Sequence, residues 1–298
     1  MKQLIFLCSL LLALNNPLFS NPSEETPDSL KAWKFHTNYM LTFSQVSYKY
    51  WASGGDNAIS GISNLKFNLK YQKNKTIWLN QFELGYGLMQ QQEKKLIKTE
   101  DKIDLNSNYT YKASTYWSYS ILANLKTQFT KGYKKPEDTI HISNFMAPGY
   151  LITSAGMEYK RDFYSFLFSI MTGKTTFVCD DYLSRLGSYG LKANQKVKIG
   201  AGSYVRFEAK KDIVTNVNLN TKLELFSEYM NNPEYVDVNW EVIVRMKINK
   251  FLSALINTNL VYDHDVLIDI KDSTGQVIEK APKVQFKETF GLGLTLIF

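Results

Sequence analysis

The segment Lys283–Phe298, KVQFKETFGLGLTLIF, decides the fold. Its apolar residues recur at every second position, which is the period of a β-strand because successive side chains point to opposite faces. The apolar face carries Val284, Phe286, Phe290, Leu292, Leu294, Leu296 and Phe298. A strand with one apolar face and a terminal aromatic residue is typical of the last strand of an outer-membrane β-barrel. We therefore expect outer-membrane lipid around the chain, and we expect the barrel assembly machinery to engage this strand through Phe298.

The first twenty residues predict a secretory signal peptide. Lys2 precedes an apolar run from Leu4 to Leu14, and cleavage is expected after Ser20. The run is too short to cross a membrane as a helix, which takes about 20 apolar residues. Residues 21–32 are polar and acidic, as in a flexible periplasmic leader. The expected organisation is a signal peptide over 1–20, a leader over 21–32 and an outer-membrane barrel over 33–298.

The composition fits a barrel and excludes some other classes. Mean hydropathy is −0.26 although 14% of residues are aromatic, because polar residues facing a lumen offset apolar residues facing lipid. The net charge is +7, but the lysines are spread along the chain, so no nucleic-acid partner is expected. Only Cys179 lies outside the signal peptide, which leaves no intrachain disulfide and no cysteine-based metal site. We predict no cofactor.

The period of two continues along the chain from Trp33. The strands expected from this pattern are Trp33–Gln45, Ile59–Tyr71, Trp78–Leu88, Ile103–Tyr111, Trp117–Phe129, Leu151–Tyr159, Tyr164–Ile170, Val197–Ala209, Ile213–Leu225, Val236–Ile248, Leu252–Tyr262 and the terminal strand. Bacterial single-chain barrels have an even number of strands. The predicted fold is therefore all-β, a transmembrane antiparallel up-and-down β-barrel of about 12 strands.

Long and short connections alternate between these strands. Tight turns are expected near Asn74, Ala113, Arg161, Lys210-Lys211-Asp212 and Asn249. Long loops are expected at 46–58, Met89–Glu100, Thr130–Pro148, Met171–Gln195, Ser227–Tyr235 and His264–Lys283. Short periplasmic turns and long extracellular loops are the rule for outer-membrane barrels. A secreted soluble β-protein is the alternative, and it gives no reason for this segregation.

Outward aromatic residues are expected at the periplasmic ends of the strands. They are Trp33, Tyr71, Trp78, Tyr111, Trp117, Tyr159, Tyr164 and Phe298. Amphipathic rings prefer the membrane–water interface, so this set predicts an aromatic girdle at one depth.

Several segments also resemble those of a known family. They are Trp51–Asn57, Thr127–Tyr133, Ser143–Leu151, Val238–Glu241, Met246–Lys250, Tyr262–Asp265 and Phe286–Glu288. On these segments, which span nearly the whole mature chain, the sequence is similar to the signal-bearing outer-membrane barrels of domain of unknown function 3078. The resemblance implies a Gram-negative envelope location. It implies no activity.

The motif at Trp51–Asn57 is a first candidate functional position. Gly54 and Gly55 permit positive φ, and Asn57 favours an Asx turn, so the motif predicts a loop folded inward. Trp51 is a candidate ligand contact in this loop.

Asp263, His264 and Asp265 form the second candidate. A titratable imidazole beside carboxylates suits general-base chemistry, provided that a second acidic or nucleophilic group converges from across the barrel mouth. A hydrated junction between strand and loop explains the triplet equally. The same acids, with Asp269 and Asp272, suggest a calcium site, but the spacing matches no EF-hand loop. We predict no metal and no catalytic residue.

The inward-facing charges indicate the state of the lumen. They mix signs, and the main ones are Arg206, Glu208, Lys222, Glu224, Glu241 and Arg245. Barrels of eight strands are filled by side chains, and those of 16 or more strands hold water channels. A barrel of twelve strands is intermediate, so strand number alone does not decide whether the lumen is open. Mixed charges predict pairing across a narrow lumen, with Trp51–Asn57 or Met171–Gln195 as a plug. The predicted function is a small-solute channel, a transport component or an envelope binding scaffold. The alternative is a surface-facing hydrolase with its site at the extracellular mouth.

Overall fold

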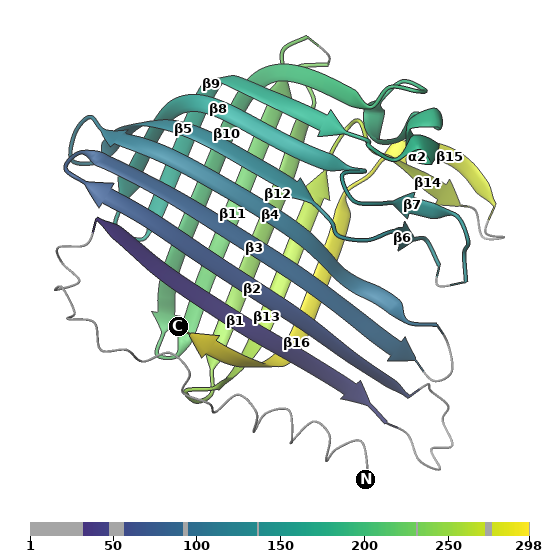
Figure 1. Cartoon of the computed structure of the whole chain (residues 1–298), viewed down its shortest axis with the longest axis horizontal. Coiled ribbons are helices and arrows are strands. Elements are labelled where there is room, and N and C mark those ends of the chain that lie inside the picture. Colours follow the sequence, from purple (N-terminus) through teal and green to yellow (C-terminus); the bar gives the residue numbers. More distant parts are fainter. Residues whose placement is uncertain are drawn as a thin grey trace. The chain divides into compact units, whose positions relative to one another are not determined.

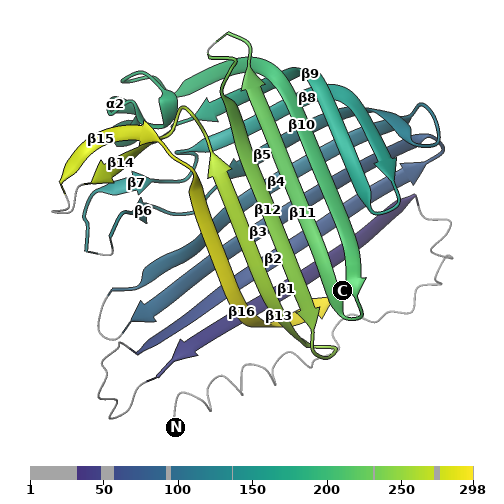
Figure 2. The ribbon, with the colours of Figure 1, turned by 180° about the vertical axis from the view of Figure 1, so that it is seen from behind.

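The computed structural model describes residues 32–47, 57–91, 95–135, 137–230, 232–271 and 276–297. From Trp33 onward these residues form one compact unit, which is a closed barrel of twelve antiparallel strands (Figure 1 and Figure 2). The predicted all-β class and strand number are confirmed. The predicted signal peptide lies outside the described residues, as does the leader up to residue 31. In the described part of the chain, no helix is long and apolar enough to span a membrane.

Each barrel strand pairs with its neighbour in the chain, apart from short inserted elements. The barrel strands are β1 (Trp33–Val46), β2 (Ala58–Lys73), β3 (Thr76–Gln91), β4 (Ile97–Lys112), β5 (Trp117–Thr127), β8 (Gly149–Arg161), β9 (Tyr164–Phe177), β10 (Val197–Val214), β11 (Val217–Glu228), β12 (Val236–Lys247), β13 (Leu252–Tyr262) and β16 (Gln285–Ile297). Connections of two or four residues alternate with longer ones, as the sequence predicted. We call the two ends of the barrel the short-turn end and the long-loop end.

The terminal segment closes the barrel as its alternation predicted. β16 pairs with β13 on one side and with β1 on the other, in a register that sets Leu41 opposite Leu294. The glycines on its polar face have a packing role. A Cβ on Gly293 would lie 2.3 Å from Cε of Met40, which is a buried side chain of β1. The missing side chain therefore makes room for the β1 side chains inside the lumen.

Two boundaries differ from the sequence-based prediction. The expected turn at Lys210-Lys211-Asp212 lies within β10, where Lys211 still pairs with Leu219, and the chain turns instead at residues 215–216. Asn216 has φ 64°, and asparagine adopts the positive φ that a two-residue hairpin turn requires. The loop expected from Met171 begins only after Phe177, because β9 continues to that residue.

The long-loop end carries short elements between the barrel strands. They are β6 (Gly132–Tyr133), β7 (His141–Ser143), α2 (Asp181–Arg185), η3 (Ser188–Gly190), β14 (Leu267–Lys271) and β15 (Val277–Pro282). They gather at one end of the barrel in both views (Figure 1 and Figure 2). We call the segments 128–148, 178–196 and 266–282 together the outer cap. The Lys134 ammonium lies 2.5 Å from a carboxylate oxygen of Asp269, which joins the first segment to the third.

The first two segments of the outer cap share a small apolar core. Ala147, Val178, Leu183 and Leu191 are buried there together. The Tyr189 hydroxyl donates a hydrogen bond of 2.5 Å to the carbonyl oxygen of Ile142. Burial raises the pKa of Tyr189 to about 12, so this hydroxyl remains a donor at neutral pH. The cap is therefore a packed structure in its own right.

The barrel wall reverses the polarity of an ordinary globular protein. Large apolar side chains are exposed around the outside, with Ile121 at 62%, Ile170 at 63% and Ile199 at 75%. The buried residues of the interior are mostly polar. Soluble monomers rarely expose apolar surface as a continuous band, whereas a barrel in lipid buries it. The outer surface is therefore suited to a membrane.

Candidate functional site

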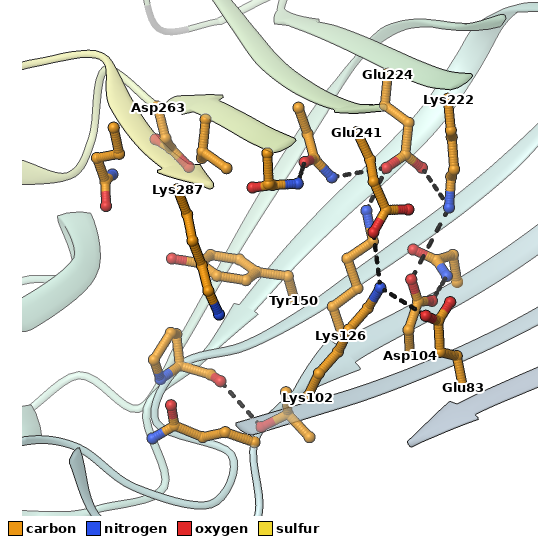
Figure 3. A pocket seen from close by; sticks show the side chains of 18 of the residues that line it. Glu83, Lys102, Asp104, Lys126, Tyr150, Lys222, Glu224, Glu241, Asp263 and Lys287 are labelled. Carbon is orange, nitrogen blue, oxygen red and sulfur yellow. Dashed lines mark hydrogen bonds and ion pairs between the residues drawn. The ribbon is translucent and has the colours of Figure 1, made fainter. Parts of the chain in front are cut away.

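Charged side chains from opposite walls meet inside the lumen and form what we call the ion-pair layer. Its members are Glu83, Lys102, Asp104, Lys126, Lys222, Glu224 and Glu241 (Figure 3). The Lys102 ammonium on β4 lies 3.3 Å from a carboxylate oxygen of Glu83 and 3.3 Å from one of Glu241. β4 and β12, which carries Glu241, are six steps apart in either direction around the ring. This contact therefore crosses the full width of the barrel.

Glu224 on β11 is the most enclosed acid of the ion-pair layer. Its carboxylate pairs with Lys126 of β5, four strands away around the ring. It also accepts hydrogen bonds of 2.7 Å from the Tyr204 hydroxyl and 2.9 Å from the Asn239 amide. The Lys222 ammonium lies 3.6 Å from the same carboxylate, so this ion pair is longer than a hydrogen bond and weaker than those above. Buried charges are stable only when they are paired and hydrogen-bonded, and Glu224 meets both conditions.

Arg206 and Glu208 lie beside the layer on β10. In the register of β10 and β11, Arg206 lies opposite Glu224 and Glu208 lies opposite Lys222. The short contact of Arg206, however, is to Glu208 on its own strand, at 3.4 Å. Its guanidinium also donates to the side-chain oxygen of Asn106 on β4, at 3.2 Å.

Arg245, the last predicted lumen charge, differs from the other members of that set. Its Nε is buried and has no hydrogen-bond partner among the described residues. It sits on β12, two residues beyond Ile243 and four beyond Glu241. Arg245 therefore lies on the short-turn side of the ion-pair layer.

A cavity of about 580 Å³ extends from the ion-pair layer to the outer cap. Tyr150, Ile152 and Phe226 contribute an apolar wall, and Lys174 and Lys287 are among the charged residues that line it. Tyr150 and Lys287 are labelled in Figure 3. Tyr189 of the cap also lines the cavity. Ligand sites are typically apolar concavities with a few fixed polar groups, and this cavity has that character.

Lys174 and Lys287 are each held in place by acids. The Lys174 ammonium lies 2.6 Å from a carboxylate oxygen of Asp237 and 2.8 Å from one of Asp263. It is also 5.8 Å from the ring centre of Tyr150. Lys287 on β16 donates 2.5 Å to the Glu100 carboxylate on β4. These contacts also join different sides of the barrel.

The structure places the Asp263, His264 and Asp265 motif at the rim of this cavity. Each carboxylate is taken by a lysine, Asp263 by Lys174 and Asp265 by Lys198 at 2.5 Å. The His264 ring stacks on Tyr235, with ring centres 3.7 Å apart.

The His264 ring nitrogen Nδ1 lies 3.4 Å from the Tyr262 hydroxyl. A second acid, Asp237, lies on the neighbouring strand β12 and not across the mouth, and the Lys174 ammonium bridges it to Asp263. Among the contacts described for this region, the imidazole ring is bonded to no carboxylate. The motif is thus organised as a set of ion pairs around the mouth.

The first candidate motif is described only at its end. Trp51, Gly54 and Gly55 lie outside the described residues, and Asn57 is exposed just before β2. Asp272, considered for calcium, also lies outside them, and Asp269 is paired with Lys134. Among the described histidines, cysteines and acids, no group of three or more is placed to hold a metal ion.

Sequence reasoning missed Lys102 and Lys174, which make the central contacts of the site. Lys102 fell between the predicted loop ending at Glu100 and the expected strand beginning at Ile103, and Lys174 fell in a predicted loop because the expected strand ended at Ile170. The signal was present in the alternation itself. Lys102 continues the inward phase of Asp104, and Lys174 lies between the buried Thr172 and Thr176. Extending each strand until the period of two broke would have placed both lysines in the lumen.

Three comparisons bear on this architecture. Residues 43–133 match the family model of DUF3078, a protein of unknown function. The resemblance that the sequence motifs indicated is confirmed over these residues. No curated protein matches the chain.

Three solved structures that are similar to this chain come from bacteria. An outer membrane channel from Pseudomonas putida F1 has 11% identity and a TM-score of 0.40, covering 94% of this chain and 100% of the other. The translocator domain of the autotransporter NalP from Neisseria meningitidis has 10% identity and a TM-score of 0.29, covering 98% and 95%. Salmonella typhi OmpF in complex with daunomycin has 7% identity and a TM-score of 0.30, covering 89% and 97%.

Proposed function

We propose that the chain is an outer-membrane barrel that takes a small solute into its external cavity and restricts passage through a narrow, ion-paired lumen. Export by the signal peptide at residues 1–20 into a Gram-negative envelope belongs to the same proposal. Assembly through the C-terminal strand, ending on Phe298, also belongs to it. The exposed apolar band of the barrel wall supports the membrane location.

The contact that carries the proposal is the bridge from Lys102 to Glu241 across the lumen. A general diffusion pore needs an open water path, which this bridge interrupts. Separating a buried ion pair leaves two uncompensated charges, so the bridge resists opening. The Lys126–Glu224 pair adds a second crossing at nearly the same level (Figure 3).

The cavity between the bridge and the outer cap supports a binding step. At about 580 Å³ it has the size of a small-molecule site. Its apolar wall at Tyr150 and Phe226 faces charged groups at Lys174 and Lys287. Such a surface suits a small amphipathic solute better than a bare ion.

A hydrolase at the barrel mouth is less well supported. It would require His264 to act as a base beside a free carboxylate, within reach of a nucleophile. The nearby carboxylates of Asp263 and Asp265 are instead paired with Lys174 and Lys198. A transport or binding role uses these ion pairs as they stand.

Planar-bilayer recording of the full mature protein tests the proposal. We expect small or absent unitary conductance, because the ion-pair layer closes the water path. Insertion is verified separately by heat-modifiable migration in gels, so that an empty membrane is not mistaken for a closed barrel. Steady porin-like currents would refute the narrow lumen and make general diffusion the leading function.

A further inference from the structure

The short-turn end of the barrel carries basic side chains directly beyond outward-facing aromatic rings. Outward positions alternate with lumen positions along a strand. Lys73 lies two residues from Tyr71, and Lys211 lies four residues from Phe207, so both lysines are at outward positions like those rings. We call this set the basic rim, and its members are Lys73, Lys75, Arg161, Lys211 and Lys250. The other lysines of these turns, such as Lys160 and Lys210, have the opposite phase and face the lumen.

The best-formed part of the basic rim is a groove of about 750 Å³ at the turn between β2 and β3. Its walls are Trp33, Tyr71, Trp78, Tyr109 and Tyr111, and its edge is the turn from Lys73 to Thr76. The Trp33 ring centre lies 4.9 Å from that of Tyr71 and 5.9 Å from that of Trp78. The groove is therefore a broad aromatic surface with two lysines at one side.

The turn that carries these lysines is fixed in place. Asn74 adopts φ 52°, as a two-residue hairpin turn requires. The Lys75 carbonyl oxygen accepts a 2.8 Å hydrogen bond from the backbone N–H of Lys112 on β4. The two ammonium groups are thus carried by a rigid loop beside the aromatic wall.

The same pairing of a cation with a ring recurs around the basic rim. The Arg161 guanidinium lies 5.5 Å from the ring centre of Tyr116. The Lys211 ammonium lies 4.8 Å from the ring centre of Phe163, and that of Lys250 lies 5.8 Å from Phe251. Long basic side chains at a membrane edge lay their stems on apolar surface and extend their charge to the headgroups.

Charge balance distinguishes the two ends of the barrel. At the long-loop end, Lys134, Lys196 and Lys198 each lie within 2.6 Å of an Asp carboxylate. At the short-turn end, the ion pair found among described residues of the basic rim is the exposed Arg161–Asp162 contact at 3.5 Å. The basic rim thus keeps an excess of positive charge at the depth where headgroups would lie.

We propose that the basic rim binds the phosphate groups of anionic phospholipids in the periplasmic leaflet, with its principal site at the Lys73–Lys75 groove. The lysines take the phosphate, and the ring faces of Trp33 and Trp78 take the upper part of the acyl chains. This rests on the proposed membrane location. Phosphate is the chemistry favoured here, because a basic residue near a bilayer surface attracts anionic headgroups.

Native mass spectrometry of the full mature protein, released from micelles containing cardiolipin or phosphatidylethanolamine, tests the proposal. We expect cardiolipin adducts to persist and phosphatidylethanolamine adducts to be lost first. In Lys73→Gln/Lys75→Gln, cardiolipin retention should weaken on the order of fivefold for each lysine removed. The matched control, Lys131→Gln/Lys192→Gln, removes two exposed lysines from the long-loop end and should leave retention unchanged.

Several results would overturn the proposal. Equal retention of both lipids, or equal losses in the rim and control variants, would show that the rim has no preference for anionic headgroups. Selective binding to peptidoglycan sacculi in place of cardiolipin would assign the rim to a different partner. Heat-modifiable migration of every variant separates these outcomes from misfolding. A wild-type protein that fails to fold in any micelle would instead refute the membrane proposal itself.

Discussion

Asp180 shows how one side chain can organise a segment of the long-loop end. Its Oδ1 accepts hydrogen bonds of 3.0 Å from the backbone N–H groups of Tyr182 and Leu183, so it caps α2. Its Oδ2 lies 2.9 Å from both the His141 ring nitrogen and the Asn144 amide. Asp180 therefore joins the first and second segments of the outer cap.

Replacing Asp180 with alanine should loosen the cap and leave the barrel intact. Loss of an N-cap costs about 1 kcal/mol, and the cap also loses its bonds to His141 and Asn144. We expect amides of residues 181–191 to exchange with deuterium about fivefold faster or more, at the roughly tenfold-per-1.4 kcal/mol scale. Peptides from β5 and β11 serve as internal controls. Unchanged exchange in the α2 segment would show that Asp180 does not hold it.

The same carboxylate predicts a pH dependence. Desolvation disfavours the charged form of Asp180, but hydrogen bonds from Asn144, the Leu183 N–H and His141 outweigh it and lower the pKa from 3.8 to about 2. A carboxylate with a depressed pKa stabilises the fold above its unfolded value and loses that contribution as pH falls through the folded value. The cap should therefore open between about pH 4 and pH 2.

Exchange rates of the α2 segment, corrected for the intrinsic effect of pH, measure this opening. Asp180→Asn keeps the shape of the side chain but has no proton to take up in this range, so its corrected rates should be flat. A wild-type profile that is equally flat would contradict the assignment to Asp180.

At the scale of elements, alternation was sufficient to predict the strands but not where each one ends. A period of two identifies a strand wherever one face is apolar, as in β12 and β16. Its end depends on partners, because β10 continues past Lys211 only while β11 pairs with it. The actual turn is at Asn216, because asparagine tolerates the φ of 64° that this turn requires. The local sequence pattern therefore predicts which side chains face the lumen better than it predicts the length of each strand.

That phase can be tested with charges placed on the outer wall. Val242 lies mid-strand on the outward phase of β12, so Val242→Arg should destabilise the membrane form by about 2–4 kcal/mol. Leu219 is also outward but lies two residues from the start of β11, so Leu219→Arg should cost less, about 0–1 kcal/mol near the interface. Urea unfolding in lipid vesicles measures both differences.

The matched control places an arginine on the lumen side of β11, at the residue next to Leu219. Asn218 lies opposite Asp212 on β10, so Asn218→Arg gains an acidic neighbour and should be tolerated. If Asn218→Arg were costly while Val242→Arg were harmless, the inward and outward faces of these strands would be exchanged.

For the whole molecule, closure of the barrel brings together residues that no local pattern connects. Lys102 and Glu241 are 139 positions apart in sequence and meet only because β4 and β12 face each other. Sequence analysis predicted mixed charges in the lumen, with Glu224 and Glu241 among them. It did not predict their partners, because pairing across a lumen depends on the tilt and register of all twelve strands. The packing of the outer cap could not be predicted from the sequence either, because its apolar core combines residues of two separate loops.

The ion-pair layer makes a final prediction about conduction. Lys102→Gln/Glu241→Gln removes the central bridge, and Glu83, the other partner of Lys102, keeps its ion pair with Lys66 at 2.9 Å. No charge is left unpaired, so stability should change little. The remaining amides are neutral and no longer hold the walls together electrostatically, so unitary conductance in a planar bilayer should rise above that of the intact protein. Lys134→Gln/Asp269→Asn removes a comparable pair from the outer cap and should conduct like the wild type. If the bridge variant folds but stays closed while the cap variant conducts, the barrier lies in the outer cap and not in the ion-pair layer.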